Sequence, residues 1–427
     1  MFVLPLPPRP SQGTIDALAA ELRQQDDQLR LITAAEAAEL ERLSRDYFDY
    51  SPLLVPRFSG QRAQLVARVS TVAQVQRVAA ACARAGVPLT LRGAGTGNYG
   101  QCVPLAGGVV LELSGLDRLR DLDADSGVIE VEAGAVMAAV DQQLAPQGRA
   151  LRLLPSTYRS ASIGGFIAGG SGGIGSLRWG FLRDPGNLLG LEVVTVEPEP
   201  RLLRLDAAAS EPLNHAYGCN GIITALRLPT CAAVAWQQLV VGFNSWAEAM
   251  EAARALAATA LLLNGLTLLE APIAARSPWP QGCAAAGRGE HRLLLLAAPD
   301  ALEVLPAWLA ARGGTIVWQA SQGVSRGLPL RELTWNHTTL HWHLEAVRQQ
   351  GAVRFAAIPL LRWQGEAPLQ QLMAQMRQAG AVIFNPHVIT VEDGGLGVID
   401  ADQVAAKAAY DPAGLLNPGK LRGWLER

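Results

Sequence analysis

Cysteine is scarce in this sequence, and no two cysteines are spaced as a metal-binding or redox motif. The five are Cys82, Cys102, Cys219, Cys231 and Cys283, an odd number without a CxxC pair. A disulfide framework and a zinc finger are therefore not expected, and a reducing cytoplasm is the predicted location.

Charged residues are also few, and neither sign prevails. Lys and Arg total 36 and Asp and Glu total 38 in 427 residues, so the formal net charge is −2. The chain therefore has no broad basic face, which argues against nucleic acid as its partner.

No uncharged run predicts a membrane span. The 18 residues from 160 to 177 carry no charge, but seven of them are glycine, which is a poor helix former. We interpret this run as a buried or ligand-lining loop. The first ten residues, MFVLPLPPRP, are too short and too rich in proline for a signal peptide.

Hydrophobic residues make up 49% of the chain, enough for a sizeable core, and the length favours two structural units. Thr71 predicts the start of a helix that ends at Gly86. The first unit is expected to have helices at 72–85 and 135–147 and strands at 87–92, 108–113, 127–134, 188–196 and 221–230. After residue 231, a second α+β unit is expected from helices at 245–260 and 301–312 and strands at 292–298 and 314–319. The tail, 409–424, is loop-like.

A glycine-rich loop, GAGTGNYGQ (93–101), follows the first of these strands. Its closely spaced glycines let the backbone turn several N–H groups toward one point, and such a concave run of donors binds anions. Thr96 and Asn98 add side-chain donors, and Arg92 adds a positive charge. The loop is not a P-loop, because no Lys follows it, and a strand rather than a helix is expected after it, unlike the usual GxGxxG fingerprint.

A second segment combines small hydroxyl residues with paired glycines. Pro155, Ser156 and Ser162 precede Gly164 and Gly165. A flat ring or a ribityl phosphate chain can approach such a backbone closely. Tight packing of strands against a helix is the alternative, but seven glycines beside several serines favour a ligand.

Five collinear pieces of the sequence resemble one family. The run RGAGTGNYGQCVPLAGGVVLELSGLDRL resembles the diphosphate-binding segment of the FAD-binding PCMH-type flavoproteins, the vanillyl-alcohol oxidase and p-cresol methylhydroxylase superfamily. The preceding STVAQVQRVAAACARAGVPLTLRG resembles the helix and strand that lead into it, and SIGGFIAGGSGGIGSLRWGFLRDPGNLLGLEVVTV resembles the second flavin segment. GCNGIITALRLP resembles the strand around the adenine, and YDPAGLLNPGKL resembles the flavin-contacting tail of the glycolate oxidase and D-lactate dehydrogenase branch.

The resemblance implies an α+β fold in which a two-subdomain PCMH-type FAD-binding domain is joined to an α+β substrate cap. We expect an N-terminal helical segment (1–50), the FAD-binding domain (51–231), the cap (232–400) and a tail that returns to the flavin (401–427).

The family's cofactor contacts carry over to this sequence as expectations. The diphosphate would lie on the backbone of Arg92, Gly93, Ala94, Gly95, Thr96, Gly97 and Asn98. The ribityl chain and isoalloxazine would lie against Pro155, Ser156, Ser162, Gly164 and Gly165. The adenine or ribose would meet Gly221, Ile222 and Ile223, and the flavin ring would meet Asn417 and Lys420.

One departure from the family concerns the link to the cofactor. Covalently flavinylated relatives carry a His in the first loop, often with a Cys in the second segment, whereas 93–101 hold no His and 155–180 hold no Cys. We therefore expect non-covalent FAD. Cys102, just after the loop, is interpreted as a small buried filler.

The histidines are the candidate catalytic bases. Of six in the chain, His337, His341 and His343 lie in TWNHTTLHWH, and His387 lies in IFNPHVIT. A neutral imidazole can take the hydroxyl proton as hydride leaves an alcohol, so His337, His341 and His387 are the candidates. Structural histidines with hydrogen bonds are the alternative. The metal-binding HGDGNxH-like signature of the D-2-hydroxy acid branch is absent, so no metal is predicted, although the histidines with Glu345 leave a site open.

The sequence thus predicts a cytoplasmic FAD-dependent oxidase or dehydrogenase. Its expected substrate is a small hydroxylated molecule, with a 2-hydroxy acid as the first candidate, and its electron acceptor is unknown. A homodimer is one candidate assembly. The alternatives are a flavin-binding subunit of a multi-subunit oxidoreductase without substrate chemistry of its own, or an oxidase of another alcohol.

Overall fold

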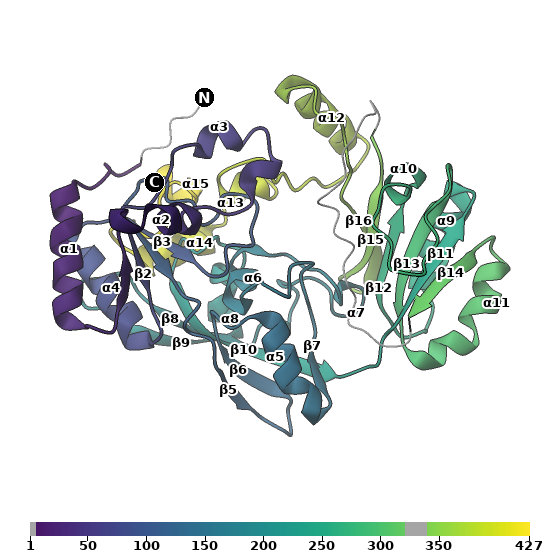
Figure 1. Cartoon of the computed structure of the whole chain (residues 1–427), viewed down its shortest axis with the longest axis horizontal. Coiled ribbons are helices and arrows are strands. Elements are labelled where there is room, and N and C mark those ends of the chain that lie inside the picture. The colour runs from purple at the N-terminus through teal and green to yellow at the C-terminus, as the bar shows by residue number, and fades with distance from the viewer. Residues whose placement is uncertain (1–5, 321–339) are drawn as a thin grey trace.

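The computed structural model describes residues 6–320 and 340–427, and their strands form three sheets. The first sheet has the order β1-β2-β4-β3, in which β2, β4 and β3 are parallel and β1 is antiparallel to β2. Its strands are β1 (Arg30–Ile32), β2 (Leu65–Arg68), β3 (Leu89–Arg92) and β4 (Val109–Glu112). Helices α1 (Gln12–Gln25) and α4 (Val72–Ala85) lie side by side against it (Figure 1).

Helix α4 shows how local chemistry sets the ends of an element. The Thr71 side chain accepts a hydrogen bond from the Gln74 N–H, and Gly86 ends the helix in the left-handed region at φ 62°. Both predicted ends are therefore confirmed. The apolar stripe of α4, including Val75 and Val78, packs into the core under the first sheet.

The second sheet is antiparallel throughout, with the order β5-β6-β10-β8-β9 and with β7 paired to β10. Its strands are β5 (Leu119–Leu122), β6 (Val128–Glu132), β7 (Arg149–Leu151), β8 (Gly190–Val194), β9 (Leu202–Asp206) and β10 (Ile222–Ala232). Helices α5 (Met137–Leu144) and α6 (Ile163–Gly169) pack on it, and α8 (Ala207–Ser210) follows β9.

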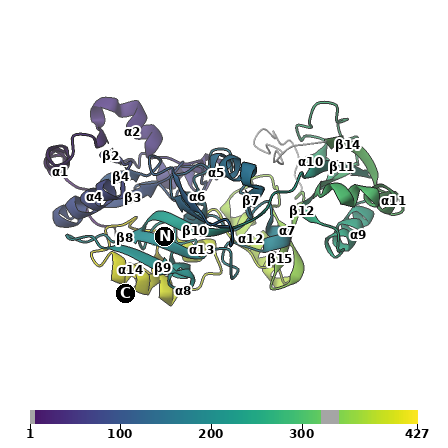
Figure 2. The ribbon, with the colours of Figure 1, turned by 90° about the horizontal axis from the view of Figure 1, so that it is seen from below.

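The third sheet forms the cap, with the order β14-β11-β13-β12-β15-β16. Its strands are β11 (Gln237–Phe243), β12 (Leu263–Leu269), β13 (His291–Ala297), β14 (Thr315–Ala320), β15 (His343–Gln349) and β16 (Ala352–Ala357). Helices α9 (Trp246–Ala257) and α11 (Leu305–Ala310) share one face with α7 (Ser176–Trp179), and α10 (Ala271–Ala274) lies on the other (Figure 2). The α+β class is confirmed.

Two predictions about local structure were wrong. The glycine run was expected to be a loop, but it contains α6 and α7, because burial of Ile163, Phe166 and Ile167 outweighs the poor helix propensity of glycine. The helix expected at 301–312 is divided: α11 begins at Leu305, since Pro306 has no N–H with which to continue an earlier helix.

The C-terminal part of the chain returns to the first sheet. Helix α12 (Glu366–Gln378) belongs to the cap side in Figure 1, and α13 (Val391–Gly394), α14 (Ala401–Tyr410) and α15 (Arg422–Leu425) lie beside the first two sheets. The Leu89 N–H donates to the Leu415 carbonyl at 2.9 Å, and Leu416 is fully buried in the core of the first sheet. Contacts with this part begin before the expected boundary at 401, because Ile389 packs on Phe48 and Phe58.

The tail is therefore expected to be part of the folding unit that holds the first sheet. Replacing Leu416 by Ala should lower the free energy of unfolding by about 2–5 kcal/mol, because it removes a fully buried side chain. Leu396→Ala is the matched control, since Leu396 is 69% exposed, and should stay within about 0.5 kcal/mol. Equal urea midpoints for the two variants would contradict this role of the tail.

Candidate cofactor site

The glycine loop lies where the parallel strands β3 and β4 end, next to the first residues of α6. Gly95 has φ 68°, and a Cβ there would overlap the Arg92 guanidinium, so only glycine fits. Within the described residues, no protein acceptor takes a hydrogen bond from the N–H groups of Gly95, Thr96, Gly97 or Asn98. These residues are partly exposed, so their donors are available to a ligand.

Arg92 is placed behind the loop rather than in front of it. Its side chain is only 6% exposed and donates to the Arg45 carbonyl, and its Nη1 lies 3.3 Å from the Sγ of Cys102. The guanidinium thus braces the loop from the protein side. The prediction that it adds charge to an anion site is not tested by these contacts, but its geometry favours support of the backbone.

The second glycine segment meets the first loop at Ser162. The Ser162 Oγ accepts a hydrogen bond from the Ala94 N–H at 3.3 Å, and a Cβ on Gly93 would overlap the same hydroxyl. The Cα of Gly165 lies 3.9 Å from the position of that Cβ, so the two glycine backbones face each other. Gly93, Ala94, Ser162 and Gly165 are therefore brought together.

Gly164 differs from Gly165 in what surrounds its Cα. Its N–H donates to the Ala133 carbonyl at 2.8 Å, and a Cβ on it would come within 2.6 Å of the Ala133 Cβ. Here the tight-packing interpretation, considered as the alternative for the glycine pair, describes the contacts. A Cβ on Gly165 would approach only the Ser162 hydroxyl. Of the two glycines, Gly164 therefore permits close packing, and Gly165 leaves space in front of its backbone.

The other expected contacts lie around this centre. Pro155 is next to the second half of the glycine segment, because a Cβ on Gly173 would come within 3.1 Å of the Pro155 Cα. Ser156 is exposed. Ile222 and Ile223 begin β10 between the two cores and pair with Val194 and Val193. Gly221 precedes them with φ 150°.

The C-terminal tail contacts the end of the glycine loop. Lys420 is fully buried, and its ammonium donates to the carbonyls of Gly100, Gln101 (3.2 Å) and Val103 (3.1 Å). Asn417 donates through Nδ2 to the carbonyls of Gln101 at 2.9 Å and Tyr217 at 2.6 Å. The tail thus sets the path of the chain directly after the glycine loop.

A buried carboxyl accompanies this buried ammonium. Burial raises the pKa of Asp46 from 3.8 to about 6, and the positive charge of Lys420 opposes that rise. Burial lowers the pKa of Lys420 from 10.5 to about 8, and Asp46 opposes that fall. Near neutral pH the two groups therefore form a buried pair of opposite charges beneath the loop.

Three tyrosines and two histidines border the site. Tyr50 is close enough to Tyr99 and Tyr217 to interact with them electrostatically, and its ring lies 5.6 Å from that of His387. The His387 Nδ1 is 2.8 Å from the Ser51 Oγ. His387, predicted from the cap segment, therefore lies on the side of the molecule that carries the glycine loop.

His215 and Tyr217 are site residues that sequence reasoning missed. Both have positive φ, 56° and 53°, and their N–H groups donate to the carbonyls of Ile167 and Ala168 in α6. The His215 Nδ1 lies 2.8 Å from the Gly170 carbonyl oxygen. The dense turn NHAYGCN before β10 was the available signal, but nothing in its spacing indicated contact with the glycine segment.

The remaining candidate histidines belong to the cap. The His341 Nδ1 lies 3.4 Å from Glu270 Oε2, and the His343 Nε2 lies 3.3 Å from Glu345 Oε1. His337 lies outside the described residues.

Among residues 6–320 and 340–427, no group of three His, Cys, Asp or Glu side chains is arranged to hold a metal ion. The same residues contain no helix with the length and apolar character needed to cross a bilayer.

The sequence and fold were compared with known proteins. Residues 63–205 match the family model described as an FAD binding domain. The chain is 30% identical over 220 residues to the glycolate oxidase subunit GlcD of Escherichia coli K12, an alignment that covers 49% of this chain and 43% of GlcD. It is 30% identical over 138 residues to the D-2-hydroxyglutarate–pyruvate transhydrogenase of Saccharomyces cerevisiae, covering 32% and 27% of the two chains.

The chain thus matches less than half the length of these relatives. A solved structure of alkyldihydroxyacetonephosphate synthase matches 98% of this chain and 90% of its own, with a TM-score of 0.70 and 14% identity, which shows a shared fold. The predicted PCMH-type fold and the FAD-binding domain are confirmed.

The buried carboxyl predicts a pH dependence of stability in the cofactor-free protein. Because folding raises the pKa of Asp46, its contribution is full below pH 3.8 and is lost as the pH rises through about 6. The unfolding free energy of the natural protein should fall by about 3 kcal/mol relative to Asp46→Asn over this range. Urea unfolding at several pH values measures the difference, and parallel curves would contradict it.

Proposed function

We propose that this chain, whose residues 63–205 form an FAD-binding domain, is an FAD-linked oxidoreductase that oxidises a small 2-hydroxy acid. The observation that carries the proposal is the position of His387 beside the tyrosines that border the glycine loop. The relatives, a glycolate oxidase subunit and a D-2-hydroxyglutarate–pyruvate transhydrogenase, support the substrate class through their names.

The site has the donor set that FAD requires. The N–H groups of residues 95–98 suit the diphosphate, and the facing glycines Gly93 and Gly165 leave room for close approach of a ligand. The buried Asn417 Oδ1 has no partner in the described structure, so it can accept a hydrogen bond from a polar ligand. We propose that the contacts predicted from the family apply here, with Gly164 and Lys420 acting through the protein rather than on the ligand.

FAD, when bound, supplies the acceptor for the hydride that leaves the substrate carbon. We assign His387 as the group that takes the hydroxyl proton. Burial lowers the pKa of His387 from its ordinary 6.5, so the imidazole is neutral at pH 7 and can act as a base. The tautomer that donates Nδ1–H to the Ser51 hydroxyl leaves Nε2 free to receive the proton.

We propose that the cofactor is held without a covalent bond. Cys102, the cysteine nearest the loop, is 7% exposed, and burial raises the pKa of its thiol to about 11. At neutral pH the side chain is therefore a thiol rather than the nucleophilic thiolate. We also propose a cytoplasmic location, which the five free cysteines support; a homodimer stays a prediction.

A second function is favoured by the cap. His341 and His343 are each within 3.4 Å of a carboxylate, and the described residues form no metal-holding group of the kind used by D-2-hydroxy acid relatives. The name of GlcD states that it is a subunit. These observations support a flavin-binding subunit without substrate chemistry of its own.

Anaerobic reduction of the FAD-loaded chain distinguishes the two functions. We expect glycolate or D-lactate to bleach the flavin absorbance of the natural protein, with a rate that falls below pH 6.5 as His387 is protonated. His387→Gln should lower the rate by about 10²-fold or more and remove this pH dependence. His341→Gln is the control from the cap and should keep the profile.

If no 2-hydroxy acid bleaches the flavin while FAD is bound, the result would favour a flavin-binding subunit without substrate chemistry of its own. Bleaching that is unchanged in His387→Gln would keep the oxidoreductase and remove His387 from its mechanism.

The mode of FAD attachment has its own test. After acid precipitation of the purified protein, the yellow chromophore should leave with the supernatant and show the absorbance of free FAD. Colour retained in the pellet would establish a covalent bond and contradict the argument from Cys102.

A further inference from the structure

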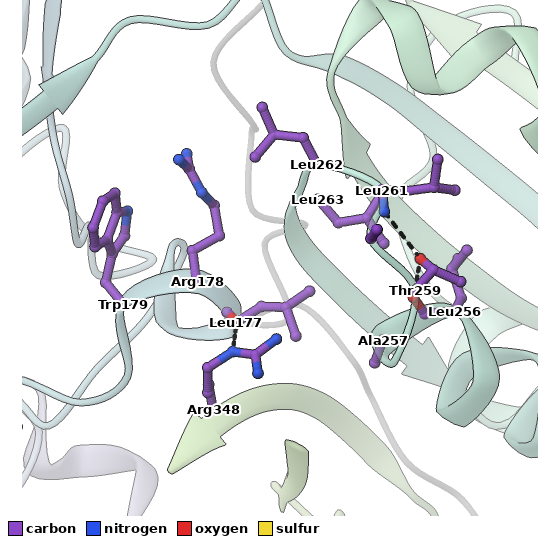
Figure 3. A pocket seen from close by; sticks show the side chains of 11 residues that line it. Leu177, Arg178, Trp179, Leu256, Ala257, Thr259, Leu261, Leu262, Leu263 and Arg348 are labelled. Carbon is purple, nitrogen blue, oxygen red and sulfur yellow. Dashed lines mark hydrogen bonds between the residues drawn. The ribbon is translucent and has the colours of Figure 1, made fainter. Parts of the chain in front are cut away.

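A cavity lies away from the glycine loop, where α7 meets the cap (Figure 3). Its volume is about 360 Å³, and its walls come from α7, the C-terminal end of α9, the loop that leads into β12, and β15. The Gly175 N–H donates to the Asn264 carbonyl at 3.0 Å, so this is a point where the first domain is joined to the cap. A cavity of this size can enclose a small organic molecule.

Among the described residues that line this cavity, the two charged ones are both cations. Arg178 approaches it from α7 and Arg348 from β15, and neither forms an ion pair in the described part of the chain. Arg178 lies over the rings of Trp179, at 4.9 Å, and Trp236, at 5.4 Å. Arg348 donates to the carbonyls of Leu177 and Gly351, at 3.3 and 3.1 Å.

A guanidinium can only donate hydrogen bonds, so the two arginines suit a ligand that carries acceptor oxygens. No Asp or Glu is among the described residues that line the cavity, so the charge on those residues is positive.

The apolar walls separate the two cations. In Figure 3, Arg178 and Arg348 reach the cavity from different sides of Leu177, and Leu261, Leu262 and Leu263 form the opposite wall. Leu262 is 38% exposed, which places the cavity at the surface rather than in the core.

We propose that this cavity binds a small aliphatic dicarboxylate. One carboxylate pairs with Arg178, the other pairs with Arg348, and the methylene chain lies against the leucines. Such a ligand bridges α7 and β15 and stabilises the join between the FAD-binding domain and the cap. The site is separate from the residues proposed for catalysis, so it goes beyond the proposed function.

Isothermal titration of the FAD-loaded protein with adipate tests the proposal. We expect one site per chain, with affinity at least about tenfold greater than for valerate, which has one carboxylate, or for inorganic phosphate. Arg178→Gln and Arg348→Gln should each weaken adipate binding by about tenfold or more. Arg159→Gln is the matched control, because Arg159 is exposed and lies over Tyr158 outside the cavity.

Several results would overturn the proposal. These are no saturable heat up to about 10 mM adipate, equal affinity for valerate or phosphate, and undiminished binding in Arg178→Gln. Since Arg348 also holds the Leu177 carbonyl, its variant can loosen the fold. Arg178→Gln decides the outcome in that case, because Arg178 donates no protein hydrogen bond in the described structure.

Discussion

The ammonium of Lys420 lies in the interior and donates to three carbonyls of residues 100–103, more than three hundred positions earlier in the chain. A buried cation of this kind is stable only when its donors are satisfied and an opposite charge is near. The carbonyls supply the first condition and Asp46 the second. The exit of the glycine loop, the position of Asn417 and the docking of the tail on β3 all depend on this arrangement.

The glycine segment at 162–180 connects the region of the glycine loop to the cap. Its first half packs α6 against Ala133 and faces the first loop through Ser162, at the candidate cofactor site. Its second half forms α7, which lies on the cap sheet beside β12 and β15. One stretch of chain therefore borders the candidate cofactor site and contacts the cap, and its small residues permit both close approaches.

The surroundings of each histidine decide whether it is a candidate base. His387 comes from a segment expected in the cap, yet its imidazole lies beside Tyr50 and Ser51 on the FAD-binding side. His341 and His343 lie near carboxylates at the cap. Residue type and local spacing could not separate these cases, because each depends on which distant segment the side chain meets.

The sequence by itself determined the elements whose causes are local. Thr71 and Gly86 set the ends of α4 through a side-chain cap and a left-handed residue, and the glycines of 93–97 allow a loop with free N–H groups. Its resemblance to a flavoprotein family predicted the FAD-binding domain. The sequence did not predict α6, because tertiary burial outweighed glycine's propensity.

Only the tertiary structure decided the pairings across long separations. It placed Lys420 behind the loop and brought His215 and Tyr217 to α6. It also gave Gly164 and Gly165 different neighbours, and it left two arginines at a cavity whose described lining residues include no carboxylate. The physical reason is that burial and charge pairing are properties of the surroundings, and the surroundings of each of these residues come from parts of the chain that no local pattern relates.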